Sequence, residues 1–243
     1  MRENYRLQRL FISGSLAKDV LISLETRQAH YLLHVLRMKA GQELLVFNGK
    51  DGEWRAAIFD IKKKTCTLKV EYKTREQESV PDVIYCFALL KQGRLDYMVQ
   101  KAVELGVAAL QPVITQHCQV VRLNEDRVQA NAVEALEQCG GLALPHCPMA
   151  KNLSALLADW DGRPLFFCDE MAKTINPLVA LEGRSRKACG VLVGPEGGFS
   201  AAERAFLCQH DFVFPLSLGP RILRADTAAV AALALIHACL GDW

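Results

Sequence analysis

The chain has 243 residues, of which 51% are hydrophobic and 23% charged, and its formal net charge is +2. These values indicate an ordinary globular protein of one large or two small domains. No apolar run reaches about 18 residues, so no membrane span is expected. The N-terminal MRENYRLQRLF lacks the apolar segment of a signal peptide.

The nine cysteines occur singly, with no C-x-x-C pair. Several lie in apolar runs, which is typical of small buried hydrophobic residues in a reducing cytosol. The other combinations of potential zinc ligands match no known spacing: His30 and His34, His117 and Cys118, and Cys139 with His146 and Cys147. We therefore expect a cytoplasmic protein without a metal site.

The charge is distributed unevenly along the chain. Residues 1–77 carry 15 lysines and arginines against 9 aspartates and glutamates, whereas residues 78–243 carry 14 against 18. Such asymmetry indicates a part that binds a polyanion, joined to a part of different charge. A solvated basic face explains the same numbers.

The first part of the chain has the pattern of a small β-barrel. After the apolar LQRLFI (7–12), a helical stripe runs from Glu25 to Met38. The run LLVFNGKDGEWRAAIFDI (44–61) contains the hairpin signals Asn48-Gly49 and Asp51-Gly52, and TCTLKVEY (65–72) alternates again. Short strands with close turns predict a barrel over residues 1–73. The polar segment that follows predicts a linker at 74–82.

From residue 83 onward, strands alternate with helices, which predicts a parallel sheet in a second domain, 83–243. The expected strands are 83–90, 109–115, 164–170, 190–194 and 213–218. The expected helices are 94–106, 126–140, 203–208 and 227–240. In such sheets, the ligand binds beyond the carboxyl ends of the strands.

One turn of this domain combines rigid and permissive residues. Gly194-Pro195-Glu196-Gly197-Gly198 follows a short buried strand and precedes Ser200-Ala-Ala-Glu203, which fits a helix capping box. A tight turn explains these residues, and so does a loop whose backbone touches a ligand. The turn matches neither the P-loop nor the dinucleotide fingerprint. Gly219-Pro220 also follows a predicted strand, which favours the ligand-binding interpretation.

The block LSLGPRILRADTAAVAALALI (216–236), together with LVGPEGGFS (192–200), resembles the bacterial 16S ribosomal RNA uridine N3-methyltransferases. These enzymes belong to the SPOUT class, which uses S-adenosylmethionine (SAM). Four upstream segments agree as well: LQRLF, HYLLHVLRMKAGQELLVFNG, LLKQGRLDYMVQKAVELG and EQCG. The resemblance thus covers essentially the whole chain, and the two linked blocks are more specific together than either is alone.

The resemblance implies a small N-terminal barrel of the PUA type and a C-terminal α/β domain with a deep trefoil knot, which is a rare topology. It also implies a homodimer formed through the knotted domains and methyl transfer from SAM to N3 of a uridine in 16S rRNA of the small subunit. The donor site carried over from the family comprises Leu192, Gly194, Pro195, Glu196, Gly197, Gly198, Leu216, Leu218, Gly219, Ile222 and Leu223.

These residue types suit a SAM site. Leu216, Leu218 and Ile222 offer an apolar slot for adenine, with main-chain groups nearby for hydrogen bonds. Glycines allow the backbone to approach a ligand closely. Prolines stiffen both loops and so reduce the entropy lost on binding.

The sequence departs from the family pattern in three places. Gly141 stands where the family commonly has an arginine after EQ-x-G, which puts a substrate contact in doubt. Ala225 and Asp226 replace the threonine and glutamate of an R-T-E-T motif. These changes remove a hydroxyl group and shorten the reach of a carboxylate.

Uridine N3 carries a proton, so methylation requires a general base or cations that stabilise the uracil anion. Arg221, Arg224, Asp226 and Glu196 lie near the donor loops in sequence. We expect Arg224 to stabilise the anion and Asp226 to act as the base. A helix N-cap explains Asp226 equally well, and a solvated turn residue explains Glu196.

The residues expected to bind RNA phosphates are Arg9, Arg37, Lys39 and Arg221, with the run Lys62–Lys64 as a further candidate. Surface charge explains Arg9 equally well, and a solvated strand end is the simpler account of the lysine run.

Three classes of function fit these patterns. The first is a SAM-dependent rRNA methyltransferase, the second a non-catalytic RNA-binding module, and the third a methyltransferase acting on another RNA or a small molecule. The basic first domain favours a nucleic-acid substrate.

Overall fold

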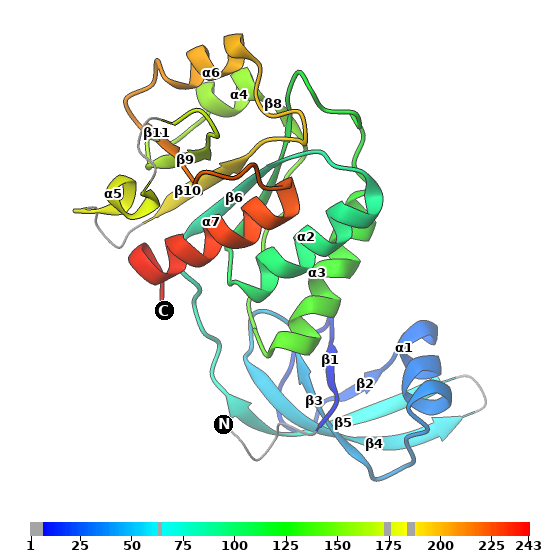
Figure 1. Cartoon of the computed structure of the whole chain (residues 1–243). Coiled ribbons are helices and arrows are strands. Elements are labelled where there is room, and N and C mark those ends of the chain that lie inside the picture. Colours follow the sequence, from blue (N-terminus) through cyan, green and yellow to red (C-terminus); the bar gives the residue numbers. More distant parts are fainter. Residues whose placement is uncertain (1–6, 63–64, 173–175, 184–187) are drawn as a thin grey trace. The chain divides into compact units, whose positions relative to one another are not determined.

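The computed structural model describes residues 7–62, 65–172, 176–183 and 188–243 (Figure 1). Lys63 and Lys64 of the lysine run lie outside the described residues. The chain divides into two compact units, Met1–Ser79 with Leu136–Ala143, and Val80–Ala135 with Leu144–Trp243. The segment 136–143 thus joins the first unit, although no sequence pattern indicated this.

The first unit contains a five-stranded sheet with the strand order β1–β3–β4–β5–β2. Its strands are β1 (Arg9–Phe11), β2 (Leu21–Ser23), β3 (Glu43–Phe47), β4 (Glu53–Lys62) and β5 (Thr65–Arg75). β1 pairs parallel with β3, whereas the other neighbours are antiparallel. The predicted hairpin is confirmed as β3–β4. β5 extends to Arg75, two residues into the segment expected to be a linker.

The helix expected from Glu25 to Met38 is shorter than predicted. It consists of α1 (Thr26–His30) and a π-helical turn (Tyr31–Val35). Ala29 and Leu32 pack from this helix into the core of the sheet. The helix stops before Arg37, whose φ of +57° is left-handed and incompatible with a continuing right-handed helix.

The second unit contains a six-stranded sheet with the order β11–β9–β10–β6–β7–β8, in which every pair is parallel. The strands are β6 (Val83–Ala88), β7 (Ala109–Ile114), β8 (Lys151–Asn152), β9 (Leu165–Cys168), β10 (Cys189–Val193) and β11 (Val213–Leu216). The helices are α2 (Gln92–Glu104), α3 (Glu125–Cys139), α4 (Leu153–Ala158), α5 (Pro177–Leu181), α6 (Ala201–Leu207) and α7 (Ala225–Leu240).

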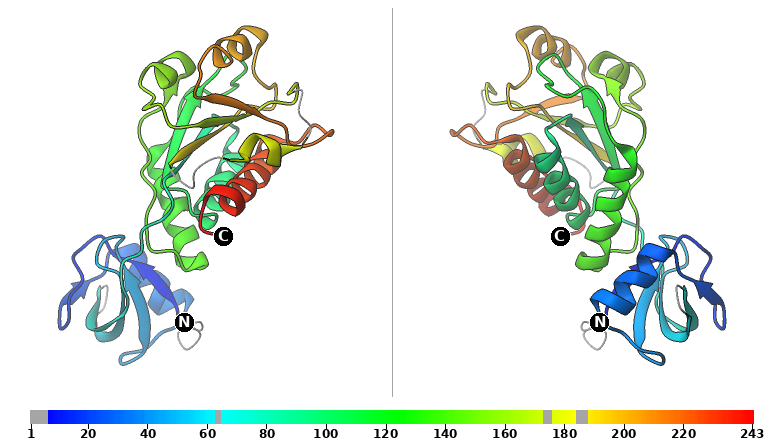
Figure 2. Two further views of the ribbon diagram at one scale, coloured as in Figure 1. Left: turned by 90° about the vertical axis from the view of Figure 1, so that its left-hand side faces the viewer. Right: turned by 90° about the vertical axis from the view of Figure 1, so that its right-hand side faces the viewer.

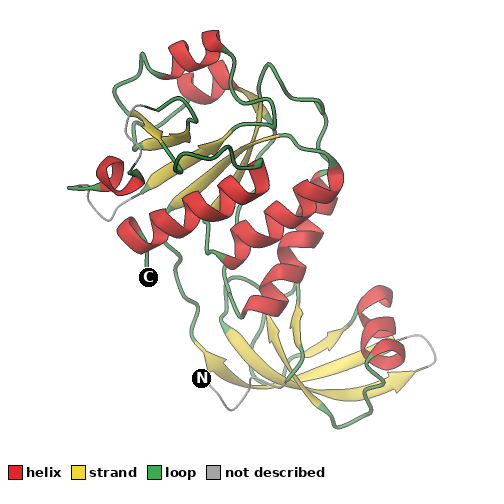
Figure 3. Ribbon diagram, viewed as in Figure 1, coloured by secondary structure: helices red, strands yellow, loops and turns green. Residues whose placement is uncertain are grey.

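The predicted alternation of strands and helices is therefore confirmed (Figure 3), while β8, α4 and α5 were not anticipated. Helices cover both faces of this sheet. α4 and α6 pack on one face, where Leu156 and Leu207 meet Phe167 and Leu192. On the other face, the Tyr85 hydroxyl contacts Met98 of α2, and α7 lies beside α2 (Figures 1 and 2).

α7 is apolar almost all round, as expected of a buried helix. Eight of its residues are buried, among them Leu233, Ile236 and His237. Among the described residues, no helix has the length and apolar character needed to cross a bilayer.

Candidate small-molecule site at the strand ends

The turn after β10 has the local geometry that its sequence predicts. The Ser200 hydroxyl accepts a hydrogen bond from the Glu203 amide at 3.2 Å, and the Glu203 carboxylate accepts one from the Ser200 amide at 2.9 Å. The predicted capping box is therefore confirmed. Gly198 adopts φ +65° and donates its amide hydrogen to the Pro195 carbonyl, a backbone conformation in which a larger residue would be strained.

Three strand ends meet beside this turn, because β9 lies between β10 and β11 in the sheet. The segments after β9, β10 and β11 line one pocket. The predicted donor-site residues that line it are Gly194, Pro195, Glu196, Gly198, Leu216, Leu218, Gly219, Ile222 and Leu223. The two glycine-bearing turns thus form one site, as the ligand-binding interpretation requires.

Two of the predicted donor-site residues do not line the pocket. Leu192 is fully buried and packs in the core between the sheet and the helices α4 and α6. Gly197 lies on the outer side of the turn, where a Cβ atom would approach His117 to 3.2 Å.

The third wall of the pocket was missed by the sequence analysis. It contains Asp169, Glu170 and Met171 after β9, together with Arg204 of α6. Asp169 is buried, its carboxylate accepts from the Arg204 Nε at 2.9 Å, and its amide donates to the Leu216 carbonyl at 3.0 Å. The two carboxylates that end PLFFCDE, at the carboxyl end of a predicted strand, were the signal that could have found this wall.

Two of the carboxylates that line the pocket form ion pairs with arginines. The Glu196 carboxylate pairs with the Arg94 guanidinium at 2.8 Å, and Asp169 pairs with Arg204.

Burial, followed by the neighbouring Asp169 carboxylate, raises the pKa of the Cys168 thiol to about 12. This thiol is therefore protonated near neutral pH and cannot serve as a nucleophile there.

The loop after β7 holds the outer side of the turn. His117 Nδ1 lies 2.9 Å from the Gly197 carbonyl oxygen and 3.2 Å from that of Gly198. Because both partners are acceptors, Nδ1 must carry the hydrogen. The Gln116 amide donates to Glu203 Oε1 at 2.7 Å, which ties the same loop to the start of α6.

The two predicted catalytic residues lie at the start of α7 and outside the pocket lining. Arg224 is the exposed N-cap residue, so an N-cap role for Asp226 is wrong. Asp226 is half-buried, and its carboxylate accepts from the Thr227 amide at 2.9 Å. Ala225, where the family has threonine, faces the pocket instead.

The predicted RNA-binding residues occupy different environments. Arg221 is exposed and lines the pocket, while Arg37 and Lys39 are exposed on the first unit. Lys62, also in the first unit, pairs with Asp60 at 3.3 Å.

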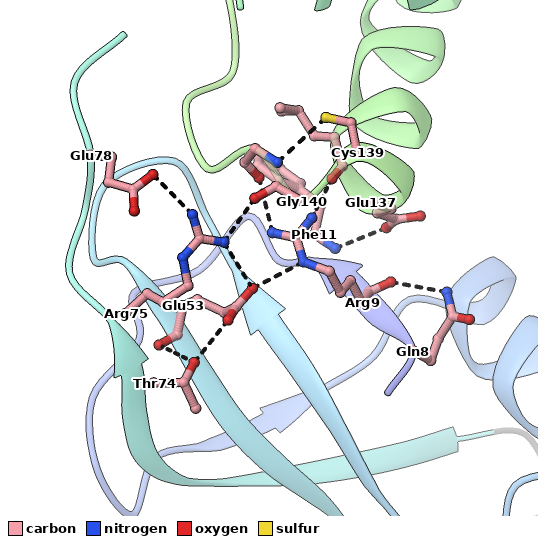
Figure 4. A network of polar contacts seen from close by, with 12 residues as sticks. Gln8, Arg9, Phe11, Glu53, Thr74, Arg75, Glu78, Glu137, Cys139 and Gly140 are labelled. Atoms are coloured by element: carbon pink, nitrogen blue, oxygen red, sulfur yellow. Dashed lines mark hydrogen bonds and ion pairs between the residues drawn. The ribbon is translucent and has the colours of Figure 1, made fainter. Parts of the chain in front are cut away.

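Arg9 lies in a buried polar network of the first unit (Figure 4). Its Nε donates to the Glu53 carboxylate at 3.0 Å, and its two terminal nitrogens donate to the carbonyls of Leu136 and, at 2.9 Å, Gly141. The guanidinium also lies 4.4 Å from the Phe47 ring centre. Arg9 is buried and each of its three side-chain nitrogens donates within the protein, so the RNA contact expected of Arg9 does not fit this structure.

Other residues extend the same network around segment 136–143 (Figure 4). Arg75 donates to the Gly140 carbonyl at 2.8 Å, and the Phe11 amide donates to the Glu137 carboxylate at 2.9 Å. The two arginines donate to carbonyl groups in the last turn of α3 and directly after it, where a helix leaves carbonyls short of partners. Sequence reasoning missed this role because the partners are far apart along the chain.

Within the described ranges, no cluster of three or more histidine, cysteine, aspartate or glutamate residues could hold a metal ion. The pocket instead offers apolar side chains, exposed backbone and a few carboxylates, which suits an organic molecule.

A doubly covered parallel sheet with a pocket beyond three strand ends defines an α/β protein that binds a small organic ligand. Residues 76–237 match the RNA methyltransferase domain family, and residues 24–71 match the RNA methyltransferase PUA domain family. The chain belongs to the RNA methyltransferase family, and its pocket lies within the matched domain.

Named relatives cover nearly the whole chain. A ribosomal RNA small subunit methyltransferase E from Rickettsia conorii is 30% identical, and the alignment covers 96% of each chain. The ribosomal RNA small subunit methyltransferase E of Bacillus subtilis is 28% identical, and the alignment covers 95% of this chain and 96% of the relative.

Two solved structures are also similar. A putative methyltransferase from Legionella pneumophila, with SAM bound, has 31% identity and a TM-score of 0.87, covering 98% of this chain and 100% of the other. The ribosomal RNA small subunit methyltransferase E of Neisseria gonorrhoeae, bound to SAM, has 25% identity and a TM-score of 0.85 with the same coverage.

Proposed function

We propose that this protein transfers a methyl group from SAM to N3 of a uridine in 16S rRNA of the small ribosomal subunit. The observation that carries the proposal is the pocket that joins the turns 194–198 and 216–223 within the matched methyltransferase domain. Relatives named as small-subunit rRNA methyltransferases and solved relatives with SAM support it. The choice of uridine N3 depends on the resemblance of the two sequence blocks.

The residues of the pocket fit SAM. Leu216, Leu218 and Ile222 provide apolar surface for the adenine ring. The Ile222 side chain is 84% exposed, which leaves an apolar surface that a bound adenine ring would cover. Gly219 has φ +101°, and beyond its chain neighbours no heavy atom of the described residues lies within 4 Å of the position that a Cβ would take. Its backbone is therefore open to a ligand. When bound, SAM supplies an electrophilic methyl group.

The protein's own residues would prepare the uridine. In our proposal, Asp226 accepts the N3 proton, and Arg224 donates hydrogen bonds to the uracil oxygens that gain negative charge. Arg221, which is exposed at the pocket, adds positive charge where the anion forms. Holding the base next to the donor converts the reaction into an intramolecular one, which supplies much of the acceleration.

Asp226→Asn tests the general base. We expect turnover on rRNA to fall by about 10²- to 10⁴-fold while SAM affinity stays unchanged, because the carboxylate lies outside the pocket lining. Thr227→Ala is a matched control, since it changes the neighbouring exposed residue and leaves the carboxylate in place. Near-normal turnover of Asp226→Asn would remove this residue from the mechanism.

The remaining features of the family form part of the proposal. We expect the first unit to be a closed PUA-type barrel, the second to contain a trefoil knot, and two chains to pair through it in the cytoplasm. Arg37, Lys39 and Arg221 would contact RNA phosphates. Light scattering on the purified protein tests the homodimer. The salt dependence of RNA binding by Arg37→Gln and Lys39→Gln tests the phosphate contacts.

Two experiments separate this function from its alternatives. Calorimetry with S-adenosylhomocysteine distinguishes the methyltransferase from a non-catalytic RNA-binding module, which should bind none. Mass mapping of 16S rRNA from cells lacking the protein should show one uridine without its methyl group. An unchanged map would favour another RNA or a small-molecule substrate.

A further inference from the structure

We infer that Glu170 binds the α-ammonium group of the methyl donor and so selects donors that carry an intact amino-acid moiety. The inference rests on the proposed function, since it assumes that SAM occupies the pocket. The residue belongs to the wall after β9, which the sequence blocks 192–200 and 216–236 do not include.

Three carboxylates line the pocket, and two of them have a cationic partner. Asp169 pairs with Arg204 at 2.9 Å, and Glu196 pairs with Arg94 at 2.8 Å. Glu170 has no hydrogen-bond or ion-pair partner among the described residues. No described residue balances the charge of this carboxylate, so Glu170 can pair with a cationic group of a ligand.

The backbone on either side of Glu170, whose own side chain is exposed, is held by its neighbours. Asp169 fixes the loop through the Arg204 ion pair, a bond from its amide to the Leu216 carbonyl, and a bond from the Met171 amide to its carboxylate at 3.0 Å. Glu170 Oε1 lies 3.4 Å from the place where a Cβ of Gly198 would sit. The carboxylate therefore stands beside the end of the turn 194–198, inside the site proposed for the donor.

The chemistry of the donor favours its ammonium group as the partner. An ammonium offers three N–H donors and a full positive charge, which matches the two oxygens of a carboxylate. The sulfonium is also positive but has no hydrogen to donate. The ribose hydroxyls donate hydrogen bonds without charge, which makes those bonds weaker.

Three probes distinguish these groups by calorimetry. SAM carries all of them, S-adenosylhomocysteine lacks the sulfonium charge, and 5′-methylthioadenosine keeps the ribose but lacks the amino-acid moiety. For Glu170→Gln we expect a loss of about tenfold in affinity for SAM and for S-adenosylhomocysteine, and no change for methylthioadenosine. Glu170→Asp, which keeps the charge, should recover part of the loss.

Glu134→Gln is the matched control, because Glu134 is an exposed glutamate of α3 outside the pocket lining. It should bind all three probes like the wild type. Circular dichroism and thermal melting of each variant verify folding.

Other outcomes contradict the inference. An equal loss for methylthioadenosine would assign Glu170 to the ribose, a loss confined to SAM would assign it to the sulfonium, and unchanged binding would exclude any contact. If the wild type binds neither SAM nor S-adenosylhomocysteine, the proposed function itself fails, and this inference with it.

Discussion

Arg9→Met should destabilise the first unit strongly, because it leaves a buried carboxylate without its nearest cation. The Arg9 and Glu53 side chains are 10% and 4% exposed, and their charged atoms are 3.0 Å apart. Removing one partner of such a pair costs about 3–5 kcal/mol. Arg75 lies 3.8 Å from the same Glu53 oxygen and retains part of the attraction. We therefore expect a loss near the lower end, about 3 kcal/mol.

Urea unfolding followed by tryptophan fluorescence can measure this loss. Trp54 lies in the first unit, whereas Trp160 and Trp243 lie in the second. In a Trp160→Phe, Trp243→Phe background, emission reports the unfolding of the first unit alone. The free energies of the single variants Arg9→Met and Glu53→Met and of the double variant then form a double-mutant cycle.

The double variant decides the cause. If an uncompensated buried charge produces the loss, replacing both residues with methionine should be less destabilising than Arg9→Met alone. A loss for Arg9→Met below about 1 kcal/mol would show that the guanidinium behaves as an exposed group. A double variant as unstable as the sum of the single ones would refute the ion-pair explanation.

Three further predictions follow from contacts in the second unit. His117→Ala should weaken SAM binding in calorimetry, whereas His117→Asn, which can still donate to the Gly197 carbonyl, should retain it. Ser200→Ala removes the capping box and should lower the free energy of unfolding in urea by about 1 kcal/mol. Burial lowers the pKa of His237 below its ordinary value of 6.5, and the Asp242 carboxylate partly opposes this shift. The unfolded chain therefore binds a proton at this histidine more readily than the folded one, so the free energy of unfolding should be highest above pH 6.5 and fall as the pH drops below that value. Unfolding from pH 5 to 7 should show a smaller slope for His237→Phe.

Local patterns predicted much of the second unit. The alternation of apolar strands and helices, the capping box at Ser200 and the glycine-bearing turns all depend on neighbours in the sequence. Because parallel strands end at one edge, the element order placed both turns at the same edge of the sheet, while the joining of 194–198 and 216–223 in one site was implied by the family resemblance.

The missed features depend on contacts between distant segments. The sequence does not reveal that β9 lies between β10 and β11, and this order places Glu170 in the pocket. Likewise, Arg9 has the same appearance in the sequence as a surface arginine. Only the arrival of the Leu136 and Gly141 carbonyls, more than a hundred positions later, makes it a buried structural residue.

The discontinuity of the first unit has a consequence for biosynthesis. Its strands are synthesised before residues 80–135, whereas the carbonyls of segment 136–143 that Arg9 and Arg75 bind are synthesised only afterwards. During translation the two arginines therefore lack these acceptors until segment 136–143 has been made. A nascent chain halted before residue 136 would expose an incompletely folded first unit to chaperones and proteases.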